Sequence, residues 1–512
     1  MPKTLTMIDP RPNGSGGQYE RGQTYTLADD LADYFLSIGV ARYPTLQQTQ
    51  VLADRDPATG EVSTIGTGRD PLGAPVVAVT SPGGGNRLSV AGARFHPLNP
   101  RWWSAVQPQA IRRPLITPGV DTLTLAGSNG GASALVDSTN NPFSSKAVEF
   151  TVPDGGASSK VAYAQATVDV NLTLDDVIVL YFYIPEDIGS LYSISAWLYE
   201  TGVTNGIAAT FEASTSVQYV GAGVIACARR LSEMTGTGPK PADAATYQNY
   251  KTLRVLHSAA AGSGIGRAQF LHAEVVRKRK PMVCITADDG WLGVRDVGAP
   301  VFNAFGIPMT LFLHTEIISG ENASYMRWAD ITRLAHKGNV MGNHTHSNKQ
   351  AGTATVEEWA ADVLVCADEL SRRGFSDGAM HLAWVQGIHS KPYDDKAREI
   401  GLLSARGVLT RGIYGSYGIP SPYAYSGISS TDRTAVQMLA DIDLEVSRGA
   451  DCTVVLHDFH ETTNAGLVCS RAEATALAKG LRERAEAGTI IVGTVPELWA
   501  RRQAEAGWSP EV

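Results

Sequence analysis

Two adjacent aspartates, Asp288 and Asp289, follow an apolar run and are themselves followed by a glycine. Asp and Gly are common in turns, so this stretch alone is compatible with a surface turn. Two further polar clusters, 342–348 (GNHTHSN) and 457–460 (HDFH), also follow apolar runs, and eight of the eleven histidines lie beyond residue 280. Because three such clusters are hard to explain as unrelated turns, we expect them to form one functional site.

Carboxylates and imidazoles in this combination are suited to metal-assisted hydrolysis. A cation such as Zn²⁺ binds carboxylate oxygen and imidazole nitrogen, and a catalytic site keeps one position open for water. One aspartate of the pair can bind the metal while its neighbour takes a proton from the water, and the cation offsets the repulsion between the two carboxylates. A histidine can then donate a proton to the leaving group. The clusters therefore predict hydrolysis of an ester or amide.

The elements that must position these clusters alternate between strands and helices from Lys280 onwards. Apolar runs predict buried strands, and a periodic apolar face predicts helices between them. The expected strands cover 282–287, 307–313, 339–341, 453–456 and 488–495, and the expected helices cover 298–305, 326–338 and 356–373. This alternation predicts a parallel sheet or barrel covered by helices, with its chemistry at the C-terminal ends of the strands.

The residues before 280 predict a different architecture. Short runs across 119–279 alternate between apolar and polar residues and are separated by clusters of Gly, Asn, Asp and Ser, as is typical of an all-β sandwich. A structural or trimer-forming module and a carbohydrate-binding module are both compatible with it. We interpret 1–45 as an N-terminal attachment segment, 46–118 as a β-rich spacer and 280–512 as the catalytic domain, so the chain is expected to be multidomain.

Composition excludes several classes of partner. The net charge is −8 and there is no basic block, whereas nucleic-acid binding needs clustered Lys and Arg. The longest strongly apolar stretch, 177–185, is too short to span a membrane, and the first residues contain no apolar signal region. The five cysteines are odd in number and show no CxxC spacing, which predicts reduced, buried thiols made in a cytosol.

From about Lys280 to the C-terminus the sequence resembles the NodB-type polysaccharide deacetylases, carbohydrate esterase family 4. The resemblance implies a distorted (β/α) barrel with a divalent metal, usually Zn²⁺. The family motif T-F-D-D-G is similar to residues 286–290 (TADDG), which implies that Asp288 is the general base and Asp289 a metal ligand. The family's last motif is similar to residues 455–458 (VLHD), which implies that His457 is the general acid.

The remaining family motifs match with departures. The motif H-[ST]-x-x-H resembles residues 344–348 (HTHSN), so His344 is an expected metal ligand and Asn348 occupies the place of the second histidine. If a helix begins there, His344 and Asn348 share a face and both reach the ion; if the chain is not helical, His346 is the alternative ligand. Residues 382–387 (LAWVQG) resemble the variant F-A-Y-P-x-G, which implies that Trp384 contacts substrate. The arginine of the commoner motif R-P-P-Y-G, which orients the base, is missing, and Ala383 stands in its place.

The order of the segments also resembles bacteriophage tail or receptor-binding proteins, as does the stretch 19–43. This resemblance implies a protein made in the host cytoplasm and carried on the virion, attached through its N-terminus to other tail proteins and assembled as a homotrimer. Its expected substrate is a bacterial surface polysaccharide, from which it removes acyl groups, with acetyl as the expected group. Two alternatives remain: a non-catalytic glycan-binding adhesin on a degenerate deacetylase fold, and a bacterial cell-wall deacetylase.

Overall fold

The computed structural model describes residues 111–505, apart from 154–159, 186–192, 203, 214–222, 260–265, 278–279, 321, 409–412, 414–421 and 424–426. Before residue 111 it describes only short strands. β1 (Lys3–Met7) pairs with β4 (Thr24–Leu27) and β5 (Ala41–Arg42), β2 (Arg11–Pro12) pairs with β3 (Gln18–Tyr19), and β6 (Gly68–Arg69) pairs with β7 (Pro75–Val76). The boundary expected between residues 45 and 46 lies outside the described residues.

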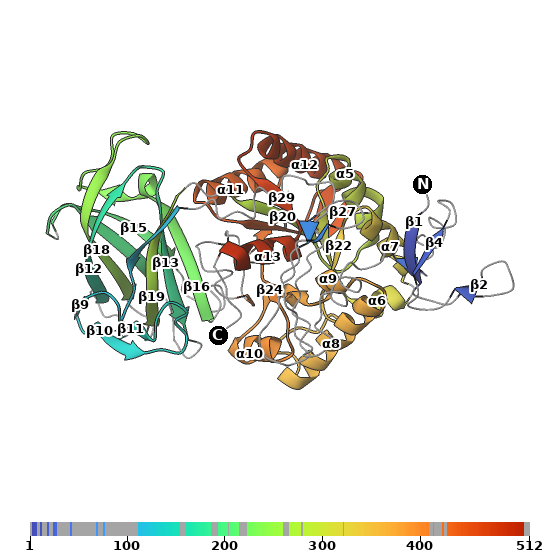
Figure 1. The fold of residues 1–512 in the computed structure, drawn as a ribbon, viewed down its shortest axis with the longest axis horizontal. Helices are drawn as coiled ribbons and strands as arrows, with labels where there is room; N and C mark the ends of the chain where they lie inside the picture. The colour runs from blue at the N-terminus through green and yellow to red at the C-terminus, as the bar shows by residue number, and fades with distance from the viewer. Residues whose placement is uncertain are drawn as a thin grey trace.

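Residues 111–277, which we call the two-sheet unit, contain two antiparallel sheets (Figure 1). One has the order β10-β11-β19-β13-β16, with β8 also on β19, and the other has the order β17-β15-β14-β18-β12-β9. The strands are β8 (Ile111–Ile116), β9 (Thr124–Ser128), β10 (Ala132–Asp137), β11 (Lys146–Val152), β12 (Lys160–Leu172), β13 (Val177–Ile184), β14 (Ser193–Tyr199), β15 (Gly206–Ala213), β16 (Gly223–Arg230), β17 (Thr235–Gly236), β18 (Gln248–Ala259) and β19 (Gly266–Arg277). Apolar side chains from both sheets share one buried cluster, as the alternating pattern predicts. Strand β8 lies in the segment that we interpreted as spacer.

The C-terminal part is built on a curled parallel sheet with the order β24-β23-β22-β21-β20-β26-β25, and β29 also pairs with β20. Its strands are β20 (Met282–Ala287), β21 (Met309–Leu313), β22 (Val340–Asn343), β23 (His381–Ala383), β24 (Ser404–Arg406), β25 (Ile428–Ser429), β26 (Cys452–Leu456) and β29 (Ile491–Gly493). β24 and β25 end the order, and no pairing between them closes the sheet among the described residues. The architecture is therefore a curled half-barrel sheet, where the sequence analysis expected a parallel sheet or a distorted (β/α) barrel.

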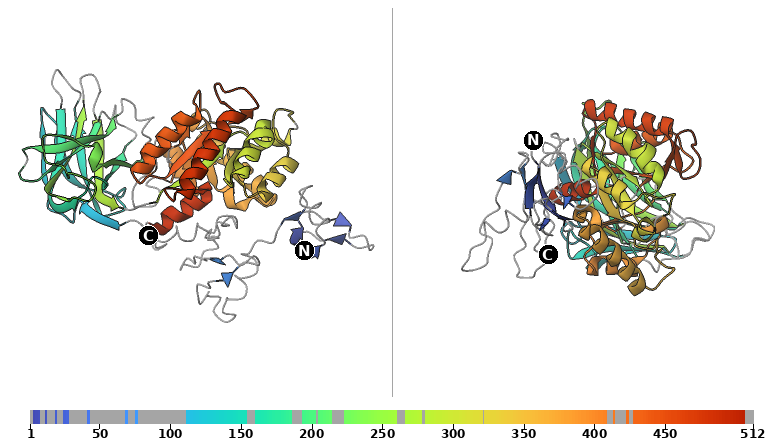
Figure 2. Two further views of the ribbon diagram at one scale, coloured as in Figure 1. Left: turned by 90° about the horizontal axis from the view of Figure 1, so that it is seen from above. Right: turned by 90° about the vertical axis from the view of Figure 1, so that its right-hand side faces the viewer.

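Helices lie on both sides of this sheet (Figure 2), because the last of them adds Val495 and Leu498 to the buried cluster of Met282 and Phe312. They are η2 (Val294–Gly298), α5 (Ala299–Ala304), α6 (Thr315–Ser319), α7 (Trp328–His336), α8 (Val356–Arg372), α9 (Ser376–Ala379), η3 (Val385–Gly387), α10 (Lys391–Glu399), α11 (Ala435–Ser447), α12 (Arg471–Glu486) and α13 (Val495–Glu505), and a small pair of strands, β27 (Asp458–His460) and β28 (Val468–Ser470), lies beside them. The strand predicted over 282–287 is confirmed. The helix predicted over 356–373 is confirmed as α8, where Thr355 caps the first turn and accepts a hydrogen bond from the Glu358 amide.

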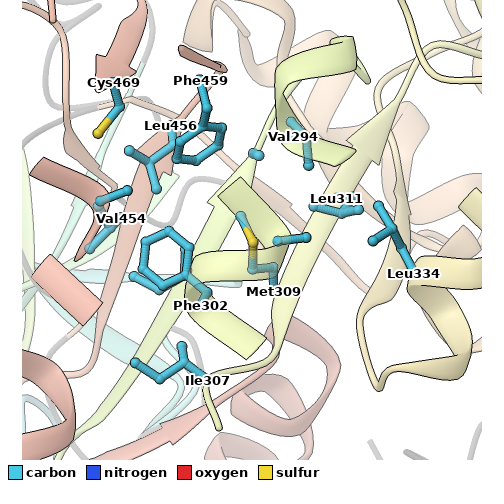
Figure 3. Packing of buried hydrophobic residues seen from close by; sticks show 14 of the residues in the cluster. Val294, Phe302, Ile307, Met309, Leu311, Leu334, Val454, Leu456, Phe459 and Cys469 are labelled. Carbon is cyan, nitrogen blue, oxygen red and sulfur yellow. The ribbon is translucent and has the colours of Figure 1, made fainter. Parts of the chain in front are cut away.

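Alternate residues of the parallel strands face opposite sides of the sheet. Met309, Leu311, Val454 and Leu456 pack on the helix side, together with Phe302 of α5 (Figure 3). Met282, Cys284 and Phe312 belong to a separate buried cluster on the concave side. Because both faces are covered, these strands read as nearly continuous apolar runs. The same alternation decides which residue at each strand end points into the concave side.

All five cysteines are free and buried, as the sequence predicted. No helix among the described residues has the length and apolar character needed to cross a membrane.

The two-sheet unit contacts the C-terminal part through the end of α11. Arg448 donates hydrogen bonds from Nε and Nη2 to the carboxylate of Glu233, the Nη2 bond being 2.6 Å long, and it also pairs with Glu445 at 3.1 Å. Ala450, fully buried, joins a cluster with outward-facing residues of β13 and β16, among them Val179 and Ala228. Figures 1 and 2 both show α11 beside this sheet. A charge pair and an apolar contact therefore fix the two parts to each other.

Replacing Arg448 by methionine should lower the free energy of unfolding by about 1–3 kcal/mol, because Glu233 and Glu445 then lose their hydrogen-bonded partner in a largely buried position. Equilibrium denaturation of the full chain measures this loss. Arg482→Met is the matched control, since the Arg482–Glu486 pair is half-exposed on α12 and should contribute little. Equal stabilities of the two variants would show that the interface pair adds nothing.

Candidate active site

The three polar clusters lie at the C-terminal ends of three strands of the parallel sheet. Asp288 follows β20, His344 follows β22 and His457 follows β26. The backbone amide of Asp288 donates to the carbonyl of Leu456, and that of His344 donates to the carbonyl of Leu313, both at 3.0 Å. These bonds extend the strand pairing by one residue, so the candidate side chains are held by the sheet itself.

Asp288 is held by an arginine that the sequence analysis did not identify. The Arg406 Nη2 lies 2.5 Å from Oδ1 and 2.6 Å from Oδ2 of Asp288, and both side chains are almost completely buried. The guanidinium also lies 5.2 Å from the centre of the Phe312 ring and donates to the carbonyl of Gly407. A buried charge-assisted contact of this kind fixes the orientation of the carboxylate.

The arginine of the motif R-P-P-Y-G is absent, as the sequence analysis states, with Ala383 in its place. Ala383 ends β23, and Arg406 ends the neighbouring strand β24 in direct register with Ala383. A different arginine, one strand away, therefore contacts Asp288. One feature of the sequence could have identified Arg406. It is a charged residue at the end of a short run of small residues, 404–406 (SAR), just as the other clusters stand at strand ends.

His457 lies on the other side of Asp288. Its Nε2 is 3.9 Å from Asp288 Oδ2, and its side chain is 18% exposed. Its Nδ1 is buried and has no hydrogen-bond partner among the described residues. The imidazole therefore presents Nε2 toward the base and remains accessible, as a proton donor to a bound substrate must be.

Asp289 and His344 form the second half of the site. Asp289 Oδ1 lies 3.4 Å from His344 Nε2, and Asp289 Oδ2 accepts a hydrogen bond from Trp291 Nε1 at 2.9 Å. Burial opposes ionisation of both groups, but their contact outweighs it, so the pKa of Asp289 is held below its usual value and the pKa of His344 is raised. The contact therefore favours the charged forms of both groups, the carboxylate and the imidazolium.

A divalent metal fits these two residues. His344 Nδ1 lies 2.8 Å from the carbonyl of Ala383, so in the neutral ring Nδ1 donates and Nε2 directs a lone pair at the carboxylate. Two ligands of one tetrahedral Zn²⁺ lie about 3.4 Å apart, which is the spacing of Oδ1 and Nε2 here. Within the described ranges no three His, Cys, Asp or Glu side chains are arranged around one point, so a complete donor set needs a further ligand.

The helix that was one of the two alternatives for residues 344–348 is absent. This segment is an irregular loop in which Thr345 and Asn348 have positive φ, 66° and 56°. Asp362 holds the loop by accepting hydrogen bonds from the amides of His346 and Ser347. The helical geometry that would direct Asn348 at the ion was therefore a wrong assumption, because the loop satisfies its amides from Asp362 instead.

The structure brings neither proposed second ligand to Asp289. Asn348 is exposed, and the described part of the chain shows no hydrogen bond from its side chain. His346 turns its Nδ1 to Thr315 Oγ1 at 2.8 Å and lies 3.9 Å from Glu369. Both residues stay predictions as ligands, with no contact here to support them.

Trp384 lies in the core. It is 1% exposed, donates from Nε1 to the carbonyl of Tyr423 at 2.6 Å, and stacks between Trp359 and His389 with ring centroids 5.0 and 5.1 Å away. A side chain buried in this way cannot present a face to a glycan, so we withdraw it as a substrate contact.

The aromatic pair beside the site is instead Trp291 with Tyr325. Their rings stack 4.3 Å apart, both are partly exposed, and Trp291 contacts Asp289.

A comparison with protein families agrees with this geometry. Residues 276–404 match the family model described as polysaccharide deacetylase. This part of the chain is therefore similar to the polysaccharide deacetylase family. The match includes Asp288, Asp289 and His344, whereas His457 and Arg406 lie beyond it. No curated protein sequence matches the chain.

Solved structures that match parts of the chain include deacetylases and a carbohydrate-binding module. The deacetylase PplD of Streptococcus pyogenes in complex with acetate is 14% identical, with 28% of this chain and 63% of that chain covered and a TM-score of 0.26. A family 4 carbohydrate esterase from Streptomyces lividans in complex with acetate is 14% identical, with coverage of 43% and 96% and a TM-score of 0.31. A family 11 carbohydrate-binding module from Clostridium thermocellum, in complex with a mixed-linked tetrasaccharide, is 9% identical, with coverage of 32% and 95% and a TM-score of 0.23.

Proposed function

We propose that this protein is a metal-dependent hydrolase that removes acyl groups, in the first place acetyl, from a bacterial surface polysaccharide. The observation that carries the proposal is Asp288, held by Arg406 on one side and 3.9 Å from His457 on the other. A glycan-binding protein without turnover needs no base beside a proton donor. The match of residues 276–404 to the polysaccharide deacetylase family supports the same activity.

The geometry supports the following roles. Asp289 and His344 would hold a divalent ion, which supplies polarisation of the acyl carbonyl and acidification of a water. Asp288 accepts the proton of the attacking water, and Arg406 keeps its carboxylate in the orientation that this transfer needs. His457 donates a proton to the departing alcohol or amine from its accessible Nε2. The stacked rings of Trp291 and Tyr325 offer an aromatic face for the sugar beside Asp289.

Chelation should abolish acetate release, and added Zn²⁺ should restore it. The assay incubates the full chain with O- and N-acetylated bacterial surface polysaccharides and with a small aryl acetate, and it measures acetate by enzymatic detection. Because the base acts on a water acidified by the cation, we expect a rate loss of at least several hundred-fold without metal, comparable with other losses of transition-state stabilisation. Release that is unaffected by chelator would contradict metal dependence, and no release from any substrate would favour the adhesin alternative.

We also propose that the enzyme is carried on a phage tail spike or fibre, as a homotrimer attached through its N-terminus. The resemblance of the segment order and of residues 19–43 to phage tail proteins supports this assignment. Tail genes next to the coding gene would support it, and the mass of the full chain in solution, measured by light scattering, tests the trimer. A coding gene among cell-wall genes would favour the bacterial deacetylase instead.

A further inference from the structure

Among the described residues no third protein donor joins Asp289 and His344, and the strand pairing points to one candidate. β21 and β22 are parallel neighbours with Leu313 opposite Asn343. His314 directly follows β21 and His344 directly follows β22, so the two histidines lie side by side at the C-terminal ends of these strands. Neighbouring strands are about 4.8 Å apart, so the backbones that carry the two imidazoles are direct neighbours.

His314 points to the concave side of the sheet. Met309, Leu311 and Leu313 of β21 pack on the helix side, whereas Phe312 belongs to the concave cluster. The backbone of His314 is still extended, with φ −95° and ψ 114°, so the alternation continues and places its side chain on the same side as Phe312. Arg406, which holds Asp288, also lies against Phe312.

The ring of His314 has an unused nitrogen. His314 is 5% exposed, and its Nε2 is buried without a hydrogen-bond partner among the described residues. A buried polar atom without a partner costs free energy, and such an atom in a native site calls for an explanation. The rings of His314 and Tyr325 are nearly perpendicular, with their centres 5.5 Å apart. Tyr325 stacks on Trp291, which donates a hydrogen bond to Asp289.

We infer that His314 is the third protein ligand of the metal, with Asp289 and His344, in the role that the family motif would give to residue 348. The inference rests on the proposed metal dependence. Since no three such side chains converge among the described residues, ligation by His314 would require its ring to turn toward Asp289 and His344. Asn348, exposed on its loop, is then free of any ligating role.

Zinc binding by purified full-length variants tests this inference without any activity assay. His314→Phe keeps an aromatic ring against Tyr325 but removes the donor, and it should weaken zinc binding by more than the roughly 10–100-fold that loss of a residue supporting a ligand costs. His346→Ala and Asn348→Ala should keep the parent affinity, and His460→Ala, an exposed histidine on β27, is the control for loss of a surface imidazole. Titration calorimetry and the metal content after dialysis give affinity and stoichiometry.

A spectroscopic measurement on the parent protein covers the case in which His314→Phe does not fold. Pulsed electron paramagnetic resonance of the Cu²⁺-loaded chain counts coordinated imidazoles, and two are expected, falling to one in a folded His314→Gln variant. Loss of metal in His346→Ala or Asn348→Ala, or unchanged binding in His314→Phe, would overturn the inference while leaving the proposed function intact. A parent protein that binds no divalent metal would instead overturn the proposed metal dependence, and the inference with it.

Discussion

Replacing Asp288 by asparagine should lower acyl release by a factor of about 10²–10⁴, the usual contribution of a general base. The amide cannot take the proton of the attacking water, whereas Asp289 and His344 are unchanged, so zinc content should stay at the parent value. Asp288 is also the partner of a fully buried guanidinium, and loss of one partner of such a pair costs about 3–5 kcal/mol of stability. The rates must therefore be compared at a temperature where circular dichroism shows both proteins folded.

Asp368→Asn is the matched control for this change. Asp368 is a half-exposed aspartate of α8 that pairs with Arg372, and its replacement should leave both activity and stability near the parent values. Parent activity in folded Asp288→Asn would remove this residue from the mechanism and leave Asp289 as the remaining carboxylate of the pair.

Replacing Arg406 by methionine should have the second-largest effect. Methionine fills a similar volume but leaves the Asp288 carboxylate buried without its partner, and about 3–5 kcal/mol of unfolding free energy should be lost. If Arg406 also positions the base, kcat should fall strongly while KM changes little, because the guanidinium contacts the carboxylate and is buried away from substrate. Denaturant unfolding and steady-state kinetics on a small acetate ester measure the two effects separately.

Arg406→Lys separates a positioning role from a structural one. Lysine keeps the charge but lacks the planar fork of the guanidinium, so stability should recover more than kcat does. Arg398→Met, which removes an exposed arginine of α10, serves as the control for loss of a surface charge. Parent kcat in folded Arg406→Met would show that Asp288 is held well enough by the rest of the site.

Much of the C-terminal fold could be predicted because parallel strands buried on both faces leave long apolar runs in the sequence. The strand over 282–287 and the helix from 356 follow from such local patterns. The contact between Asp288 and His457 followed from one further rule, that polar residues at the ends of parallel strands meet at the same edge of the sheet. These two residues are 169 positions apart in the sequence and 3.9 Å apart in the structure.

The remaining features depend on pairings that no local pattern encodes. Arg406 reaches Asp288 only because β24 pairs with β23 in the register that places Arg406 opposite Ala383. The loop at 344–348 avoids a helix because Asp362, on α8, accepts its amides. The motif suggests that Trp384 contacts substrate. In the structure it is buried because Trp359, earlier in the sequence, and His389, later in the sequence, both stack against it.

The two-sheet unit is attached near the N-terminal end of β26, opposite the end that carries the candidate active site, and this separation has a thermodynamic consequence. Arg448 and Ala450 precede β26, whereas His457 follows it, and the five residues of that strand span about 16 Å. Substitutions this far apart without a shared partner add their free energies independently. Substitutions at the attachment surface should therefore leave the activation barrier of the reaction unchanged. The same C-terminal part could be combined with different N-terminal units. A double variant of Arg448 and His457 should show no coupling energy.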